Sequence, residues 1–230
     1  IRTRRPRSDV VRLLVRFGVC LLLLMGIVGS PDRQGVAQTP GVLFGSSAGQ
    51  RGNESPREAV ERLEAAIGRQ LAVVRVFKRW DAAFPTDYER WLRQSGHAIF
   101  LSAAAQRLDG SNIPWSSIAN AQPGSALYED IVSWADRIGA YGAPVFFAFD
   151  AEPETGPTSM GDPGDFVDAW RRIVSVFRDR GITNARFVMT LTAFTYGRTD
   201  ARGAAAWYPG DDWVDAIGAD GYNFFGCSPG

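Results

Sequence analysis

The stretch Pro144–Glu154, PVFFAFDAEPE, decides the fold, because an apolar run passes there directly into an acidic turn. The run Pro144–Phe149 carries no polar side chain, which is typical of a β-strand covered on both faces in a parallel sheet. In α/β barrels the catalytic groups lie where such strands end and the following loops begin. The turn after Phe149 is therefore the first candidate for a functional site.

Short apolar runs alternate with helical patterns on both sides of this strand. The expected strands are 41–44, 71–77, 98–102, 144–149, 186–191 and 214–218. The expected helices are 56–67, 87–94, 127–138 and 166–177, the first opened by a capping box at Ser55–Glu58. This alternation predicts a parallel α/β sheet. We expect a (β/α)8 TIM barrel truncated after about the sixth strand, with an open doubly wound sheet as the alternative.

The N-terminal 37 residues have the pattern of a signal peptide. Arginines precede the apolar run Phe17–Gly29, and Gly35–Ala37 offers small residues for cleavage. The run is short for a bilayer span, and an uncleaved membrane anchor is the alternative. We expect residues 38–40 to form a linker, 41–230 to form the body, and the protein to be secreted, touching a membrane only through an uncleaved anchor.

Composition excludes two classes of function. The chain has no net formal charge, but residues 38–230 hold 18 basic and 23 acidic side chains, a net of −5. A mildly acidic body is a poor binder of polyanions, so nucleic acid is not expected as a partner. With His97 and Cys227 as the body's only His and Cys, no zinc site can be assembled and no cofactor is expected.

The acidic turn has the composition of a general acid site. Asp150, Glu152 and Glu154 are three carboxylates within five residues, directly after a buried strand. Clustered like charges raise one another's pKa, as a general acid at neutral pH requires. A solvated acidic loop, or an Asp150 that only caps the strand end, is the alternative interpretation.

Aromatic and polar side chains follow other expected strands. Trp80 comes after the second strand, and Tyr222 and Asn223 come after the sixth. Rings that stack on the C–H faces of sugars, beside carboxylates and amides that bind hydroxyls, suit a carbohydrate ligand. We therefore predict a polysaccharide or oligosaccharide substrate, contacted by Trp80, Asp150, Glu154, Tyr222 and Asn223.

Two segments resemble glycoside hydrolase family 26, which includes β-mannanases and related endo-glucanases. They are VFFAFDAEPE, ending at Glu154, and WYPGDDWVDAIGADGYN at 207–223. The resemblance implies that Glu152 is the catalytic acid/base and that Tyr222 lines the sugar site. It also implies a β-mannan or β-glucan substrate and a retaining two-carboxylate mechanism. Ala151 stands where the family has His, which departs from the usual mannan-binding pattern.

The resemblance places the nucleophile on a seventh strand, beyond Gly230. We therefore expect the 41–230 body to be an incomplete glycoside hydrolase barrel, an N-terminal fragment that is inactive as an isolated polypeptide. No catalytic metal is expected.

Two other functions compete with hydrolysis of glycans. Ala151 in place of His would also suit a non-catalytic carbohydrate-binding barrel with a decayed active site. The run Gly45–Gly49, GSSAG, matches the nucleophile elbow of serine hydrolases. The expected helix starts too late for that motif, and His97 precedes a strand, which places it at the opposite end of the sheet.

Overall fold

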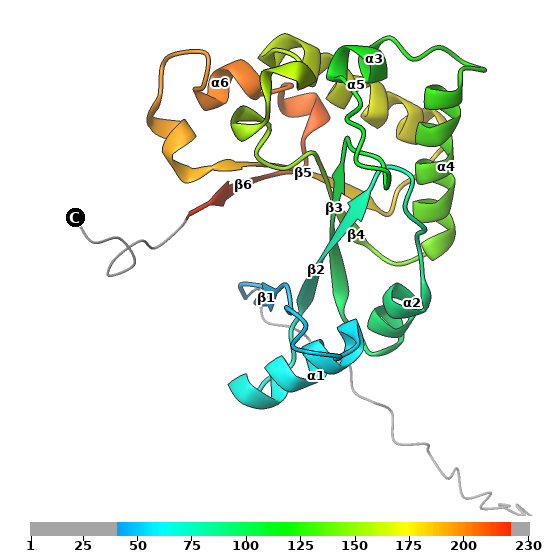
Figure 1. Ribbon diagram of the computed structural model, residues 1–230, viewed down its shortest axis with the longest axis vertical. Helices are drawn as coiled ribbons and strands as arrows, with labels where there is room; N and C mark the ends of the chain where they lie inside the picture. Colours follow the sequence, from blue (N-terminus) through cyan, green and yellow to red (C-terminus); the bar gives the residue numbers. More distant parts are fainter. Residues whose placement is uncertain (1–40, 222–230) are drawn as a thin grey trace, which may run out of the picture. The chain divides into compact units, whose positions relative to one another are not determined.

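The computed structural model describes residues 41–221, whose six parallel strands pair in sequential order from β1 to β6 (Figure 1). The strands are β1 Gly45–Ser46, β2 Val73–Arg79, β3 Ala98–Ala104, β4 Val145–Phe149, β5 Ala185–Thr192 and β6 Ala216–Asp220. A doubly wound sheet would reverse its strand order at a switch point. The unbroken order is that of the first six strands of a (β/α)8 barrel, so the predicted fold class is confirmed.

The first strand lies later than predicted. The sequence predicts it at 41–44, but β1 is Gly45–Ser46, and Val42 and Leu43 are 96% and 48% exposed. A Cβ atom on Gly45 would lie 2.4 Å from the carbonyl oxygen of Val73. Pairing with β2 therefore begins at the residue that lacks a side chain, and the apolar residues before it stay outside the sheet.

The four predicted helices are present. They are α1 Pro56–Ile67, α2 Asp87–Gln94, α4 Ala126–Tyr141 and α5 Pro163–Asp179. The short helices α3 Trp115–Ala119 and α6 Ala204–Trp207, and the 3-10 turns η1 Pro153–Thr155, η2 Thr158–Met160, η3 Ala193–Gly197 and η4 Asp211–Trp213, were not predicted. Each spans too few residues to repeat a helical period, so no hydrophobic pattern signals it.

The core lies between the sheet and its helices, and it is rich in aromatic rings. Phe147 of β4 packs against Trp134 of α4, Phe177 of α5 and Phe187 of β5, with ring centroids 6.3, 5.5 and 5.8 Å away. Phe146, the preceding residue of β4, points to the opposite face of the sheet. That face borders a hollow of about 590 Å³, to which all six strands contribute residues. The alternation along β4 thus separates a helix-covered face from an interior face.

Helix α1 starts as its sequence predicts. The Glu58 backbone N–H donates to Ser55 Oγ over 3.2 Å, and the Ser55 N–H donates to Glu58 Oε2 over 2.7 Å. The reciprocal pair satisfies two backbone donors that a helix start would otherwise leave open.

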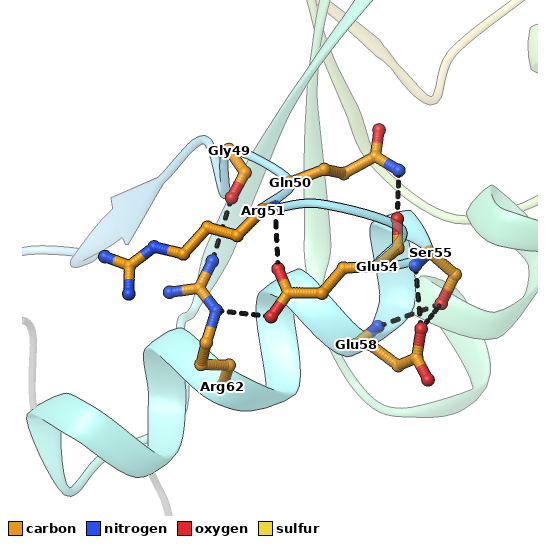
Figure 2. A network of polar contacts seen from close by, with 7 residues as sticks. All are labelled: Gly49, Gln50, Arg51, Glu54, Ser55, Glu58 and Arg62. Atoms are coloured by element: carbon orange, nitrogen blue, oxygen red, sulfur yellow. Dashed lines mark hydrogen bonds and ion pairs between the residues drawn. The ribbon is translucent and has the colours of Figure 1, made fainter.

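A charged network fixes the loop between β1 and α1 (Figure 2). Arg62 Nε lies 2.7 Å from Glu54 Oε1, while its Nη2 donates to the Gly49 carbonyl over 2.8 Å. The Arg51 backbone N–H donates to Glu54 Oε2 over 2.9 Å. Arg62 also holds the pKa of the Glu54 carboxyl below its usual value. The network ties the end of the GSSAG run to α1.

The serine hydrolase alternative fails on this geometry. Helix α1 begins at Pro56, several residues after the run Gly45–Gly49, whereas a nucleophile elbow passes from strand to helix at the serine. His97 is buried just before β3 and bonds Glu64 Oε1 over 2.8 Å. It therefore lies at the amino end of the sheet, away from the loops that follow the strands.

Replacing Gly68 by Ala is expected to lower the free energy of unfolding by about 1 kcal/mol. This is the cost of holding a residue with a side chain in the left-handed backbone conformation. Gly68 ends α1 at φ 67°, and no atom lies within 4 Å of a Cβ built there, so the cost is in the backbone alone. Urea unfolding measures the change. Gly49→Ala, at an equally open position without positive φ, is the matched control and should keep or slightly raise the stability. Equal stability of both variants would contradict this account.

The predicted signal peptide and linker lie outside the described residues. Between residues 41 and 221, no helix is both long and apolar enough to cross a bilayer.

Candidate active site

The turn after β4 has a backbone conformation that residues other than glycine rarely adopt. Asp150 and Glu152 both have positive φ, at 43° and 59°. Their N–H groups donate to Ala103 O on β3 and Thr190 O on β5, each over 2.8 Å. Left-handed non-glycine residues persist only where the surroundings hold them, and they cluster at functional sites. The two neighbouring strands hold the turn in this shape.

Asp150 supports the turn from within. Its Oδ2 accepts from Trp115 Nε1 over 2.7 Å, and its Oδ1 accepts from the Ala105 N–H over 3.3 Å. Burial raises the pKa of the Asp150 carboxyl, and these two hydrogen bonds oppose that rise. Asp150 also lines the pocket described below, and both of its oxygens accept hydrogen bonds from the protein.

Glu152 lies in a pocket of about 450 Å³ at the ends of the strands. The pocket is lined by Arg75, Phe77, Lys78, Arg79, Ser102, Ala103, Ala104, Asp150, Ala151, Glu152 and Asp220. These residues come from β2, β3, β6 and the turn after β4. The acidic turn therefore faces side chains that are far apart in the sequence, as expected at the carboxyl end of a barrel sheet.

The surroundings of Glu152 favour its protonated form. Burial raises the pKa of its carboxyl most, followed by a hydrogen bond with Asp220 and by the charges of Asp220 and Glu154, while Arg75 lowers it. Two carboxylates in one pocket repel each other, which favours a proton on one of them. Glu152 Oε1 is also buried without a donor in the described part of the chain. Such a group is suited to proton donation.

Arg75 and Ser102 belong to the pocket wall and were not predicted. Arg75 Nε donates to Ser102 Oγ over 3.1 Å, and its Nη1 lies 3.5 Å from Asp220 Oδ2. Its guanidinium also lies over the rings of Phe77 and Phe100, 4.7 and 5.4 Å from their centroids. Both polar residues sit inside strands rather than after them. The one available signal was a charged residue interrupting the apolar strand 71–77.

Glu154 does not line this pocket, which corrects its predicted role as a sugar contact. It is buried, 8% exposed, and its Oε1 accepts three hydrogen bonds. The donors are the Thr192 N–H at 2.6 Å, Thr192 Oγ1 at 2.6 Å and Thr195 Oγ1 at 2.9 Å. The third carboxylate of the turn therefore faces β5 and η3.

Trp80 lies in the core, which corrects the prediction that it stacks on a sugar. It is 2% exposed, and its ring meets Phe149 edge-on with centroids 6.1 Å apart. Its Nε1 donates to Asp130 Oδ2 over 3.1 Å. A ring covered in this way has no face to offer a ligand. Tyr222 and Asn223, also predicted to bind substrate, lie outside the described residues.

Within residues 41–221, no group of three or more His, Cys, Asp or Glu side chains is arranged to hold a metal ion.

The C-terminal part of the chain matches a known family. Residues 125–227 match the model of glycosyl hydrolase family 26. Endoglucanase H of Acetivibrio thermocellus is 28% identical over 93% of this chain, which spans 23% of that protein's length. The predicted resemblance to the family is confirmed by these matches.

Solved structures share the fold. A GH26 beta-mannanase from Bacteroides ovatus, BoMan26A, has a TM-score of 0.56 at 19% identity, covering 80% of this chain and 62% of that one. The YdhT protein from Bacillus subtilis has a TM-score of 0.57 at 19% identity, covering 79% and 64%. The chain thus spans less than two thirds of the length of these structures.

Proposed function

We propose that this chain, a relative of glycoside hydrolase family 26, cleaves the O-glycosidic bonds of a β-linked polysaccharide with Glu152 as its proton donor. The observation that carries the proposal is the setting of Glu152, a pocket-lining carboxyl whose pKa is raised by burial and by Asp220. Strained backbone at Asp150 and Glu152 supports it, because such conformations cluster at active sites.

The mechanism we propose is retaining. Glu152 protonates the leaving oxygen as the glycosidic bond breaks and a carboxylate attacks the anomeric carbon; ionised Glu152 then takes a proton from the incoming water. The attacking carboxylate lies about 5–5.5 Å from the acid in such enzymes. We do not assign that role to Asp220, which lies in the pocket with Glu152 and is paired with Arg75, whose Nη1 is 3.5 Å from its Oδ2. We assign Asp220 as the partner that favours the protonated form of Glu152.

The substrates we propose are β-mannan and β-glucan. The named relatives include an endoglucanase and a beta-mannanase. Ala151 lines the pocket with a methyl group where the family has an imidazole, so one polar contact to the sugar is replaced by space. This change favours tolerance of more than one sugar configuration. We also propose that the protein is secreted, as its N-terminal pattern predicts, because these polymers are extracellular.

Activity assays on a set of polysaccharides test this function. Release of reducing ends is measured on β-mannan, mixed-linkage β-glucan, chitin and starch. We expect release from β-mannan or β-glucan and none from starch, whose bonds have the opposite anomeric configuration. No release from either β-linked polymer, with the protein folded, would overturn the proposal.

A non-catalytic carbohydrate-binding barrel is the second candidate, favoured by Ala151. Affinity electrophoresis through gels containing each polymer separates the two. Retarded migration together with no release of reducing ends would support the binding protein. The raised pKa of the Glu152 carboxyl favours the hydrolase, because a general acid must hold its proton until the glycosidic bond breaks.

A further inference from the structure

Glu154 is a buried carboxylate that the proposed mechanism does not use. It follows Glu152 by two residues, across Pro153, and belongs to the turn η1. Its Oε1 accepts from three donors, two from Thr192 at the end of β5 and one from Thr195 in the η3 turn that follows. These bonds join the loop after β4 to the loop after β5 at the carboxyl end of the sheet.

The hydrogen bonds from Thr192 and Thr195 do not require Glu154 to be charged. One oxygen accepts every donor, and a Gln amide oxygen could stand in its place as an acceptor for Thr192 and Thr195. The other oxygen, Oε2, is buried and has no hydrogen-bond partner among the described residues. Burying a charged oxygen without a hydrogen-bond donor costs free energy of folding. A carboxylate kept at this position despite that cost is expected to have a function that needs its charge. The nearby group whose behaviour depends on that charge is Glu152.

The groups that face Glu152 come from three directions. Asp220 approaches from β6, Arg75 from β2 and Glu154 from its own turn. The negative charges of Asp220 and Glu154 raise the pKa of the Glu152 carboxyl, and Arg75 lowers it. Glu154 also acts on its other side, where its charge adds to burial in raising the pKa of the Tyr196 hydroxyl.

We propose that Glu154 is a positioning residue, which holds Glu152 in place through Thr192 and Thr195 and keeps a fixed negative charge beside it. The left-handed backbone of Glu152 is secured on one side by its N–H bond to Thr190 O and on the other by the Glu154 anchor. Position and charge are thus supplied by one side chain that does not line the pocket of Glu152. The inference rests on the proposed role of Glu152 as the acid.

Two substitutions separate position from charge. Glu154→Gln keeps the acceptor for Thr192 and Thr195 and removes the charge. Glu154→Ala removes both and leaves the donors unpaired. Glu129→Gln is the control, because Glu129 is exposed and accepts one long bond from the Gly124 N–H, 3.3 Å.

For Glu154→Gln we expect a near-normal KM and a melting temperature lowered less than in Glu154→Ala, because its NH2 group takes the buried place of Oε2, which has no hydrogen-bond partner among the described residues. Its pH–rate profile should change, because the acid must be protonated and its pKa falls when a neighbouring negative charge is lost. The alkaline limb of kcat/KM therefore shifts to lower pH. Glu154→Ala should also lose at least about tenfold in kcat, since the acid is no longer held in place. An alkaline limb at the same pH as in Glu129→Gln would overturn the proposal.

A titration without turnover keeps this inference distinct from the function itself. The carboxyl carbon of Glu152, labelled with carbon-13 and assigned with Glu152→Gln, is followed by NMR as the pH changes. Its midpoint should fall in Glu154→Gln and stay in place in Glu129→Gln. If the protein hydrolyses no glycan but the midpoint still falls, only the hydrolase proposal fails. An unmoved midpoint refutes the role of Glu154, whether or not the protein is active.

Discussion

Replacing Glu152 by Gln is expected to lower kcat on unactivated β-linked polysaccharide about 10²–10⁴-fold, the usual contribution of a positioned general acid. Gln has the size of Glu and can still bond the glycosidic oxygen, but it has no proton to give. Binding should persist, so KM should change little. Initial rates of reducing-end release measure the loss, and far-UV circular dichroism checks that the variant folds.

The leaving group provides the internal control for Glu152→Gln. An aryl glycoside with a good leaving group departs without protonation, so its first bond-breaking step should be much less affected than that of the polysaccharide. Equal losses on both substrates would mean that the substitution disturbs the site in general. Full activity on the polysaccharide would remove Glu152 from the mechanism.

Replacing Asp150 by Ala is expected to lower the free energy of unfolding by about 1–3 kcal/mol, the cost of leaving a buried donor unpaired. The orphaned donor is Trp115 Nε1, now 2.7 Å from Asp150 Oδ2. The Ala105 N–H loses its side-chain acceptor as well. Activity should fall too, because the strained turn that carries Glu152 is released. Urea unfolding and polysaccharide assays measure the two effects.

Asp150→Asn is the matched variant for that prediction. Its amide oxygen can still accept from Trp115, but its NH2 group would then face the Ala105 N–H, donor against donor. We therefore expect a smaller loss of stability than in the Ala variant. Wild-type stability in Asp150→Ala would show that the bonds to the β3–α3 loop do not hold the turn.

Much of the architecture could be predicted from local pattern. The run Pro144–Phe149 indicated a buried parallel strand, and the capping box indicated the start of α1, because both depend on neighbouring residues alone. β1 was misplaced because its position depends on how closely Gly45 approaches Val73, a contact between distant segments. Hydrophobicity marked the apolar residues near that strand but not the residues that pair.

The site was predictable only where its residues follow strands directly. Glu152 was predicted by this rule, and it lines the pocket. Arg75 was missed because it reaches the pocket from inside β2, and the contacts that place it there join distant strands. Trp80 and Glu154 were assigned to the sugar although they turn toward the core and toward β5. Position along the chain does not show which way a side chain turns after a strand.

A crystal structure of Glu152→Gln with an intact β-linked oligosaccharide tests the central claim most directly. The measured quantity is the distance from the side chain of residue 152 to the oxygen of the bond that the wild-type protein cuts. Proton donation predicts hydrogen-bond reach, roughly 2.6–3.2 Å. An oligosaccharide bound in the pocket with that oxygen beyond reach of residue 152, even through one water, would contradict the account.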